Sequence, residues 1–266
     1  MPEIITLLTD FGLKDHYVAS MKGVILDIYP YAVIVDISHD VPKYSIRTAA
    51  FILKCAYKYF PRGTIHVVVV DPGVGTQRRP IVVKTTNYYF VGPDNGVLMM
   101  AAQEDKIKEV YMIENPEFMR REISYTFHGR DIFAPTAAYL AQGYSVEQVG
   151  RHIEDYIVPS FSRAKVKNGS IEGEVVHIDD FGNVITNISA NDLKLLGIEI
   201  GEKVLVEIDG KELELRLVKS FGYAEKGEMV LIIDSENLLE ISINLGNAAE
   251  ELKVDIGDQV CIRLRS

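Results

Sequence analysis

Residues 66–79, with the sequence HVVVVDPGVGTQRR, decide the fold of this chain. The unbroken β-branched run predicts a strand that is buried on both faces, as in the parallel sheets of α/β proteins. The run ends in a carboxylate, Asp71, followed by a turn with two glycines and by Arg78. Open α/β sheets bind ligands beyond the carboxyl ends of their strands. Asp71 is therefore a candidate functional residue, and its alternative role is to form the turn through its own backbone.

The rest of the first 160 residues fits a sheet around this strand. Short apolar runs predict further strands at 4–9, 32–37, 81–85 and 88–91, besides 64–70 itself. Apolar residues at steps of three and four predict helices at 18–28, 49–56 and 132–142. This alternation indicates a layered α/β domain with a central, largely parallel sheet.

The second part of the chain has a different pattern. Periodicity fades between residues 151 and 170, where we place a linker. Short strand-like runs separated by glycines follow, at 173–178, 184–188, 203–208, 212–218, 229–233, 239–243 and 259–264. Such runs predict a small β-barrel. We therefore expect a catalytic α/β domain at 1–160 and an all-β barrel domain at 170–266.

Composition narrows the class of protein. The chain has 266 residues, of which 47% are hydrophobic, enough for substantial cores. No apolar run approaches the roughly 20 residues of a membrane span, and residues 1–8 lack a basic leader, so we expect a cytoplasmic protein without a membrane partner. The net charge of −10 disfavours nucleic-acid binding and favours a neutral or cationic small ligand.

Two polar clusters lie before predicted helices in the α/β part. Asp10, after the first strand, suits a ribose diol, because a carboxylate can accept two hydrogen bonds. The alternative is that Asp10 or Asp15 caps the helix that begins near residue 16. His128 can act as acid, base or hydrogen-bond donor, or be structural. Asp131 suits the first turn of the helix after it.

Two further segments offer ligand contacts. Residues 179–187, DDFGNVITN, combine an aromatic ring, a glycine and amides, which suits the face and edge of an adenine. The alternative is a plain hairpin turn. Residues 247–249 follow a strand and a glycine, so they either present backbone groups to a ligand or turn a corner, whereas 92–96, GPDNG, has the composition of a structural turn.

Metal and phosphate chemistry find no motif. The acids and histidines of the chain show no compact ligand spacing, so we expect no metal. The glycines after Asp71 are not followed by Gly-Lys-Ser/Thr, so no phosphate-binding loop is predicted.

Taken in order, these segments resemble the S-adenosylmethionine hydroxide adenosyltransferase family, which is related to fluorinating and chlorinating enzymes. The motifs that carry the resemblance are LTDFG at 8–12, VDPGVGT at 70–76 with Arg78, GPDNG at 92–96, FHGRDIF at 127–133, and FGN at 181–183 with TN at 186–187. They span nearly the whole chain. The resemblance implies an α/β domain, a C-terminal β-barrel and a homotrimer with active sites shared between neighbouring subunits.

The resemblance also assigns roles. It implies a catalytic set of Asp71, Arg78 and His128, in which Asp71 and His128 handle a water molecule and either could accept its proton. The substrate-binding residues that it implies are Asp10 for the ribose, Asp179 for the methionine ammonium, and Phe181, Asn183, Phe221 and the backbone near Ala248 for the adenine. The chain departs from the common pattern at Asp180, where relatives often have Arg, and at Ile185, where halogenating relatives have Trp.

The implied reaction is the metal-independent hydrolysis of S-adenosyl-L-methionine to adenosine and methionine, without a cofactor, by attack of water at the ribose 5′ carbon. Water must lose a proton as it attacks, so a carboxylate or an imidazole beside it is useful. Two alternatives stay open. A halide-dependent adenosyltransferase is disfavoured because halogenating relatives have tyrosine at the position of Asp71, and a non-catalytic sensor of S-adenosylmethionine or adenosine has no need of the three residues.

Overall fold

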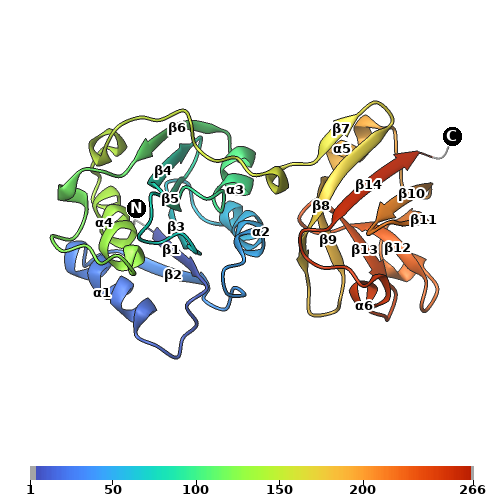
Figure 1. Ribbon diagram of the computed structural model, residues 1–266, viewed down its shortest axis with the longest axis horizontal. Coiled ribbons are helices and arrows are strands. Elements are labelled where there is room, and N and C mark those ends of the chain that lie inside the picture. Colours follow the sequence, from blue (N-terminus) through green and yellow to red (C-terminus); the bar gives the residue numbers. More distant parts are fainter. Residues whose placement is uncertain (1–3, 265–266) are drawn as a thin grey trace. The chain divides into compact units, whose positions relative to one another are not determined.

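The computed structural model describes residues 4–264, which divide into two compact units at Pro159 and Ser160 (Figure 1). The first unit is a six-stranded sheet between helices. Its strands are β1 (Ile4–Thr9), β2 (Val33–Ser38), β3 (Ile65–Val69), β4 (Pro80–Thr85), β5 (Tyr89–Pro93) and β6 (Ile107–Met112). Its α-helices are α1 (Tyr17–Ile28), α2 (Ile46–Ala56), α3 (Met99–Glu104) and α4 (Ala134–Ala141).

The strand order is β2-β1-β3-β5-β4-β6. Strands β2, β1, β3 and β5 are parallel to one another, and β4 runs antiparallel to both β5 and β6. The valines at 67–70, in β3 and directly after it, alternate between two cores. Val67 and Val69 pack in the core that α1 and α4 cover, whereas Val68 and Val70 pack in the core of α2 and α3. The prediction of a layered, largely parallel α/β domain is confirmed, and the unbroken valine run reflects burial from both sides.

The second unit is a closed β-barrel, as predicted. Seven of the strands described up to residue 264 form the ring β14-β10-β11-β12-β13-β9-β8, which the pairing of β8 with β14 closes. The bounds are β7 (Lys165–Lys167), β8 (Ser170–Ile178), β9 (Val184–Ser189), β10 (Lys203–Ile208), β11 (Lys211–Val218), β12 (Met229–Ile233), β13 (Leu238–Ile243) and β14 (Gln259–Leu264). Two short helices, α5 (Ala190–Leu195) and α6 (Ala248–Leu252), connect strands of the ring.

Several elements differ from the sequence prediction. Helix α3 and strand β6 were not predicted, because the first is six residues long and the second alternates only weakly. The helix predicted at 132–142 begins earlier, as a π-helical turn at Gly129–Phe133, and continues as α4. Strand β7 lies inside the stretch assigned to the linker. Within residues 4–264, no helix combines the length and apolar character that a membrane crossing requires.

Candidate active site

The turn after β3 brings Arg78 back onto Asp71. Arg78 Nε donates to Asp71 Oδ1 over 3.0 Å, and Arg78 Nη2 donates to Asp71 Oδ2. Only 7% of the arginine side chain and 4% of the aspartate side chain are exposed. A bidentate, desolvated pair of this kind fixes both groups more strongly than a surface ion pair does.

Gly75 lets this turn pack closely against the segment that precedes His128. Its φ is +74°, and a Cβ atom at this position would lie 2.2 Å from the carbonyl oxygen of Tyr125. Only glycine fits such a close approach at positive φ. Inside the turn, Thr76 Oγ1 donates to the carbonyl of Gly73 over 2.7 Å. The glycines thus join two segments that are distant in the sequence.

His128 completes the group. Its Nδ1 atom lies 3.1 Å from Arg78 Nη2. Burial, together with the charge of Arg78, lowers the pKa of His128, against the opposing charges of Asp71 and Asp131. The imidazole is therefore neutral near pH 7. Because arginine only donates, Nδ1 must be the acceptor, and Nε2 carries the proton.

Asp131 holds the segment around His128. It is fully buried in the π-helical turn, and Arg130 binds it through two hydrogen bonds of 2.7 and 2.9 Å. Its Oδ2 atom also accepts the backbone N–H of Ser124 over 2.9 Å. The expected first-turn acid is thus present, with the added task of fixing the loop at 124–128. π-Helical turns occur often at functional sites.

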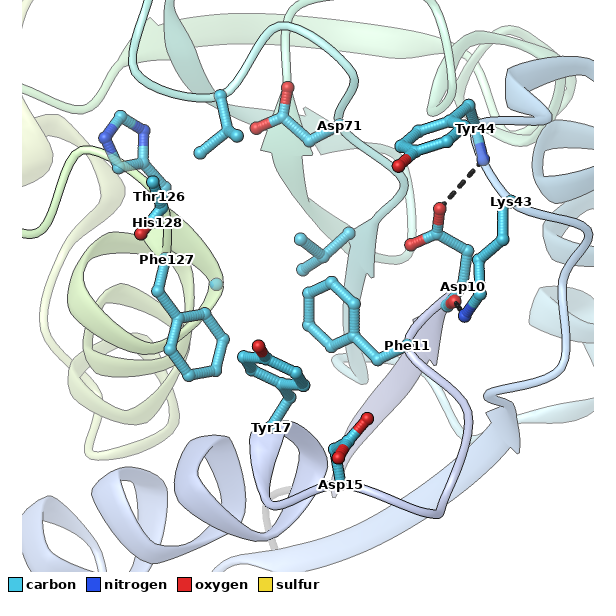
Figure 2. A pocket seen from close by; sticks show the side chains of 13 residues that line it. Asp10, Phe11, Asp15, Tyr17, Lys43, Tyr44, Asp71, Thr126, Phe127 and His128 are labelled. Atoms are coloured by element: carbon cyan, nitrogen blue, oxygen red, sulfur yellow. Dashed lines mark hydrogen bonds between the residues drawn. The ribbon is translucent and has the colours of Figure 1, made fainter.

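A pocket of about 320 Å³ lies beside these residues and is lined by Asp71, His128 and Asp10 (Figure 2). Asp10 Oδ2 accepts the backbone N–H of Tyr44 over 2.9 Å, and Lys43 Nζ donates to the carbonyl of Asp10. The alternative that Asp10 or Asp15 caps α1 is wrong: His16 occupies the N-cap position, and no side chain makes a capping hydrogen bond there.

The sequence analysis missed the aromatic lining of the pocket. Phe11, Tyr17 and Phe127 contact one another at ring-centroid distances of 5.2 to 5.9 Å and lie opposite Asp71 (Figure 2). Tyr44 lies at the side of Asp10 with a φ of +65°, which is strained for a bulky residue. Phe11 and Phe127 adjoin predicted site residues, which was a usable signal. No signal in the sequence pointed to Tyr44, because only the tertiary fold brings it beside Asp10.

The remaining predicted binding residues belong to the second unit. Asp179 organises the turn between β8 and β9, since its Oδ1 accepts the N–H groups of Phe181 and Asn183, both over 2.9 Å. Its Oδ2 accepts the Asn183 amide over 2.9 Å. This turn leaves the Phe181 ring 79% exposed, so the hairpin interpretation is correct and the ring is still available.

Phe221 and Ala248 differ in what they can offer. Phe221, in a short 3₁₀ turn, is 40% exposed. Ala248 is fully buried in the barrel core at the start of α6, main chain included, so the backbone groups that can meet a ligand here are those of neighbouring residues. A separate surface pocket of the second unit is lined by Asp179, Asp180 and residues of the α6 segment.

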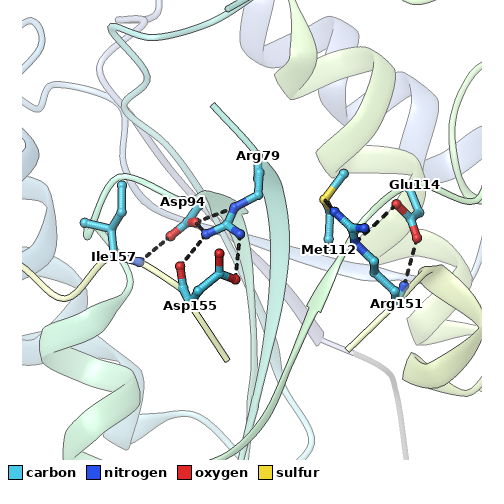
Figure 3. A network of polar contacts seen from close by, with 7 residues as sticks. All are labelled: Arg79, Asp94, Met112, Glu114, Arg151, Asp155 and Ile157. Carbon is cyan, nitrogen blue, oxygen red and sulfur yellow. Dashed lines mark hydrogen bonds and ion pairs between the residues drawn. The ribbon is translucent and has the colours of Figure 1, made fainter. Parts of the chain in front are cut away.

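The GPDNG turn is structural, as expected (Figure 3). Asp94 is buried and accepts two hydrogen bonds from Arg79, over 3.0 and 2.6 Å. The other Asp94 oxygen accepts the N–H of Ile157 over 2.8 Å, while Arg79 also binds the side chain and the carbonyl of Asp155. These contacts fasten the end of the first unit to its sheet.

In the part of the chain that is described, no three His, Cys, Asp or Glu side chains gather as a metal site would require.

Comparison with known proteins identifies the family of this chain. Models of the SAM hydroxide adenosyltransferase N-terminal and C-terminal domains match residues 5–150 and 173–261. An (R)-S-adenosyl-L-methionine hydrolase of Methanocaldococcus jannaschii is 37% identical, over 97% of this chain and 95% of its own length. A fluorinase of Nocardia brasiliensis is 29% identical, over 98% and 97%.

Two solved structures share the fold of this chain. An uncharacterized conserved protein of Thermotoga maritima superimposes with a TM-score of 0.86 at 44% identity, covering 98% of this chain and all of the other. A conserved hypothetical protein of Thermus thermophilus gives 0.79 at 34% identity, with the same coverage. With both domain models matched in order along most of its length, this chain belongs to the SAM hydroxide adenosyltransferase family.

Proposed function

We propose that this protein hydrolyses S-adenosyl-L-methionine to adenosine and L-methionine. The observation that carries the proposal is the joining of Asp71, Arg78 and His128 at the wall of a pocket that also presents Asp10. A carboxylate and an imidazole held by one guanidinium suit the handling of water. The relatives at 34 to 37% identity are named hydrolases of this substrate, whereas the fluorinases are 27 to 29% identical.

Asp71 orients the attacking water and accepts its proton in this proposal. Each carboxylate oxygen keeps a second lone pair after binding Arg78, so the group can still accept a hydrogen bond from water. His128 has its Nδ1 turned to Arg78 and donates from Nε2 to the water oxygen. Asp71 thus accepts a hydrogen bond from the water, and His128 donates one to it.

Asp10 and the aromatic lining bind the nucleoside in this proposal. The second oxygen of Asp10 accepts hydrogen bonds from the ribose diol, while the backbone of Tyr44 holds the first. Three carboxylates line the pocket, those of Asp10, Asp15 and Asp71, and they outnumber Lys43 in the lining and Arg78 behind Asp71. This excess of negative charge and the rings of the pocket favour a sulfonium cation through charge and cation–π attraction.

Departure of methionine needs little assistance. The C5′–S bond breaks as the C5′–O bond forms, the electron pair leaves on sulfur, and the product is a neutral thioether. No acid, metal or cofactor is needed to stabilise that leaving group. Alignment of water and carbon in a near-attack geometry can contribute roughly 7 to 11 kcal/mol to lowering the barrier.

We also propose that the active form is a cytoplasmic homotrimer in which the turn of Asp179, Phe181 and Asn183, with Phe221 and the backbone near Ala248, completes the site of a neighbouring subunit. An apolar ring that is 79% exposed, such as Phe181, is better suited to an interface than to water. Sedimentation of the purified protein tests the trimer, and a monomer that is fully active would exclude it.

The deciding experiment incubates the protein with S-adenosyl-L-methionine in ¹⁸O-water after treatment with a chelator. We expect adenosine with ¹⁸O at the 5′ oxygen, and unlabelled methionine. In the relatives' names, L gives the configuration at the amino-acid carbon, so (R) refers to the sulfonium centre. We therefore supply the two sulfonium epimers in separate incubations. Halogenated adenosine formed with added chloride or fluoride would indicate the adenosyltransferase alternative, and binding without product would indicate a sensor.

A further inference from the structure

A chain of polar contacts runs from the surface to the backbone of a pocket residue. Lys22 Nζ on α1 lies 2.6 Å from Asp36 Oδ2 on β2, and Asp36 Oδ1 lies 3.1 Å from His39 Nε2. On its other side, His39 Nδ1 lies 2.9 Å from Thr9 Oγ1. Thr9 Oγ1 in turn accepts the backbone N–H of Phe11 over 3.2 Å. One buried imidazole thus links a half-exposed ion pair to the turn that lines the pocket.

The direction of each contact follows from chemistry. Partial burial opposes the ionisation of Asp36, but hydrogen bonds from Lys22 and His39 outweigh it and lower the pKa of this carboxyl. A carboxylate only accepts, so the His39 nitrogen that faces it carries the proton. When the other ring nitrogen carries no proton, it accepts a hydrogen bond from the Thr9 hydroxyl. That leaves the lone pairs of Thr9 for the Phe11 amide.

His39 holds the pocket turn at a second point as well. Its backbone carbonyl accepts the N–H of Gly12 over 2.7 Å, and Gly12 has a φ of +71°. Residues 10–12 carry the Asp10 carboxylate and the Phe11 ring into the pocket. The same histidine therefore binds this turn through both its side chain and its main chain.

We propose that His39 and Thr9 are positioning residues that set the orientation of the turn at 10–12, and with it the ribose-binding carboxylate of Asp10. The proposal rests on the function proposed above. Thr9 is fully buried and His39 is 4% exposed, so neither can touch a substrate, although the order Thr-His-Asp is that of a nucleophilic triad. Their effect reaches the substrate through Phe11 and Gly12.

Thr9→Val tests the proposal, because it keeps the shape of the side chain and removes both of its hydrogen bonds. The chain supplies a matched control on the same strand. Thr6 is also fully buried, its Oγ1 lies 2.8 Å from Nδ1 of a buried histidine, His66, and it does not line the pocket. Thr6→Val therefore has the same chemical cost in the core without a link to the turn.

We expect Thr9→Val to raise KM for S-adenosyl-L-methionine about tenfold and to change kcat less than about twofold, since the three residues at the chemical centre lie on other segments. Thr9→Ser should restore KM, and Thr6→Val should leave it unchanged. If Thr9→Val does not fold, Asp36→Ala breaks the same chain at a half-exposed position, and a rise in KM of about threefold is expected. Equal KM values for Thr9→Val and Thr6→Val would overturn the proposal.

Hydrogen exchange of the free protein separates this proposal from the proposed function. Mass spectrometry of peptides that cover residues 8–13 should show faster exchange of the Phe11 and Gly12 amides in Thr9→Val than in Thr6→Val, by about tenfold. An unchanged rate would overturn the positioning role. Absence of turnover by the wild-type protein, with the exchange difference present, would instead overturn the proposed function alone.

Discussion

Arg78 Nη2 lies 3.1 Å from His128 Nδ1, and the same atom binds the Asp71 carboxylate. A donor that is shared in this way makes the protonation of the histidine depend on the aspartate pair. It keeps the imidazole neutral, with its proton on Nε2, so in the mechanism proposed above Asp71 is the group that accepts the proton of the water.

Replacing Arg78 by lysine should lower kcat on the order of a hundredfold. Lysine keeps the charge but cannot bind both Asp71 oxygens and the imidazole at once. Steady-state kinetics of Arg78→Lys measure the effect, and Arg121→Lys, at an exposed position, should match wild type. Wild-type kcat in Arg78→Lys would mean that charge alone suffices.

The acid limb of the pH–rate profile should reflect His128. Its pKa is lowered by burial and by the charge of Arg78, so the neutral form persists below the usual value of 6.5 and activity is lost only at more acid pH. In Arg78→Met the limb should move to higher pH, because the repelling charge is gone. Profiles of kcat/KM between pH 4 and 8 decide this, and a limb that does not move contradicts the assignment.

His66 should make the protein less stable as the pH falls. Burial lowers its pKa to about 3, from 6.5, against the opposing charge of Asp105. Between these values the unfolded chain binds a proton that the folded one excludes. The free energy of unfolding should therefore decrease by about 1.4 kcal/mol for each pH unit below 6.5, a contribution that is fully present above that pH.

Urea unfolding of wild type and His66→Leu at pH 7, 6 and 5 isolates this contribution. The difference in free energy of unfolding between the two should shrink with falling pH, because leucine does not titrate. His16→Gln, at an exposed histidine, should follow wild type. Parallel curves for wild type and His66→Leu would show that His66 is protonated in the folded state.

Gly75→Ala should destabilise the protein by about 3 kcal/mol and abolish most activity. The new methyl group would collide with the Tyr125 carbonyl at a φ that L-residues avoid, and the turn would move away from His128. Gly73→Ala is the matched control in the same turn, since its Cβ would meet only ordinary contacts of 3.4 Å or more. Thermal melts with activity assays should separate the two, and equal behaviour would contradict the close-approach argument.

Arg79→Ala should loosen the end of the first unit. It would leave the buried Asp94 carboxylate without its cation, at a cost of about 2 kcal/mol after allowing for the partial exposure of Arg79. Limited proteolysis should then cut faster near residues 151–160. Asp155→Ala removes only the exposed partner, which is 81% exposed, and should change the cutting rate little.

The layers and the barrel could be predicted because burial imposes a pattern on the sequence. The valine run of β3 is unbroken because helices cover both faces of the sheet. The barrel strands are separated by turns with glycines that take positive φ. The pairing of Asp71 with Arg78 was also predictable, because the two residues are only seven apart and the turn between them contains two glycines.

The rest required tertiary information. The carboxyl of Asp10 is held by the amide of Tyr44, 34 residues away, and no local pattern marks a residue whose backbone is the functional part. The chain of polar contacts through His39 could not be predicted from the sequence either, because its partners Thr9 and Asp36 lie on two different strands.

The π-helical turn at Gly129–Phe133 gives the site an unusual sensitivity to chain length. A π-helical turn closes its hydrogen bonds over five residues where an α-helix uses four, so deleting one residue between His128 and Asp131 would draw the turn back to regular α-helix and change the spacing between His128 and the buried carboxylate that holds the loop at 124–128. A one-residue deletion just after His128 is therefore expected to disturb this site although neither His128 nor Asp131 is itself replaced.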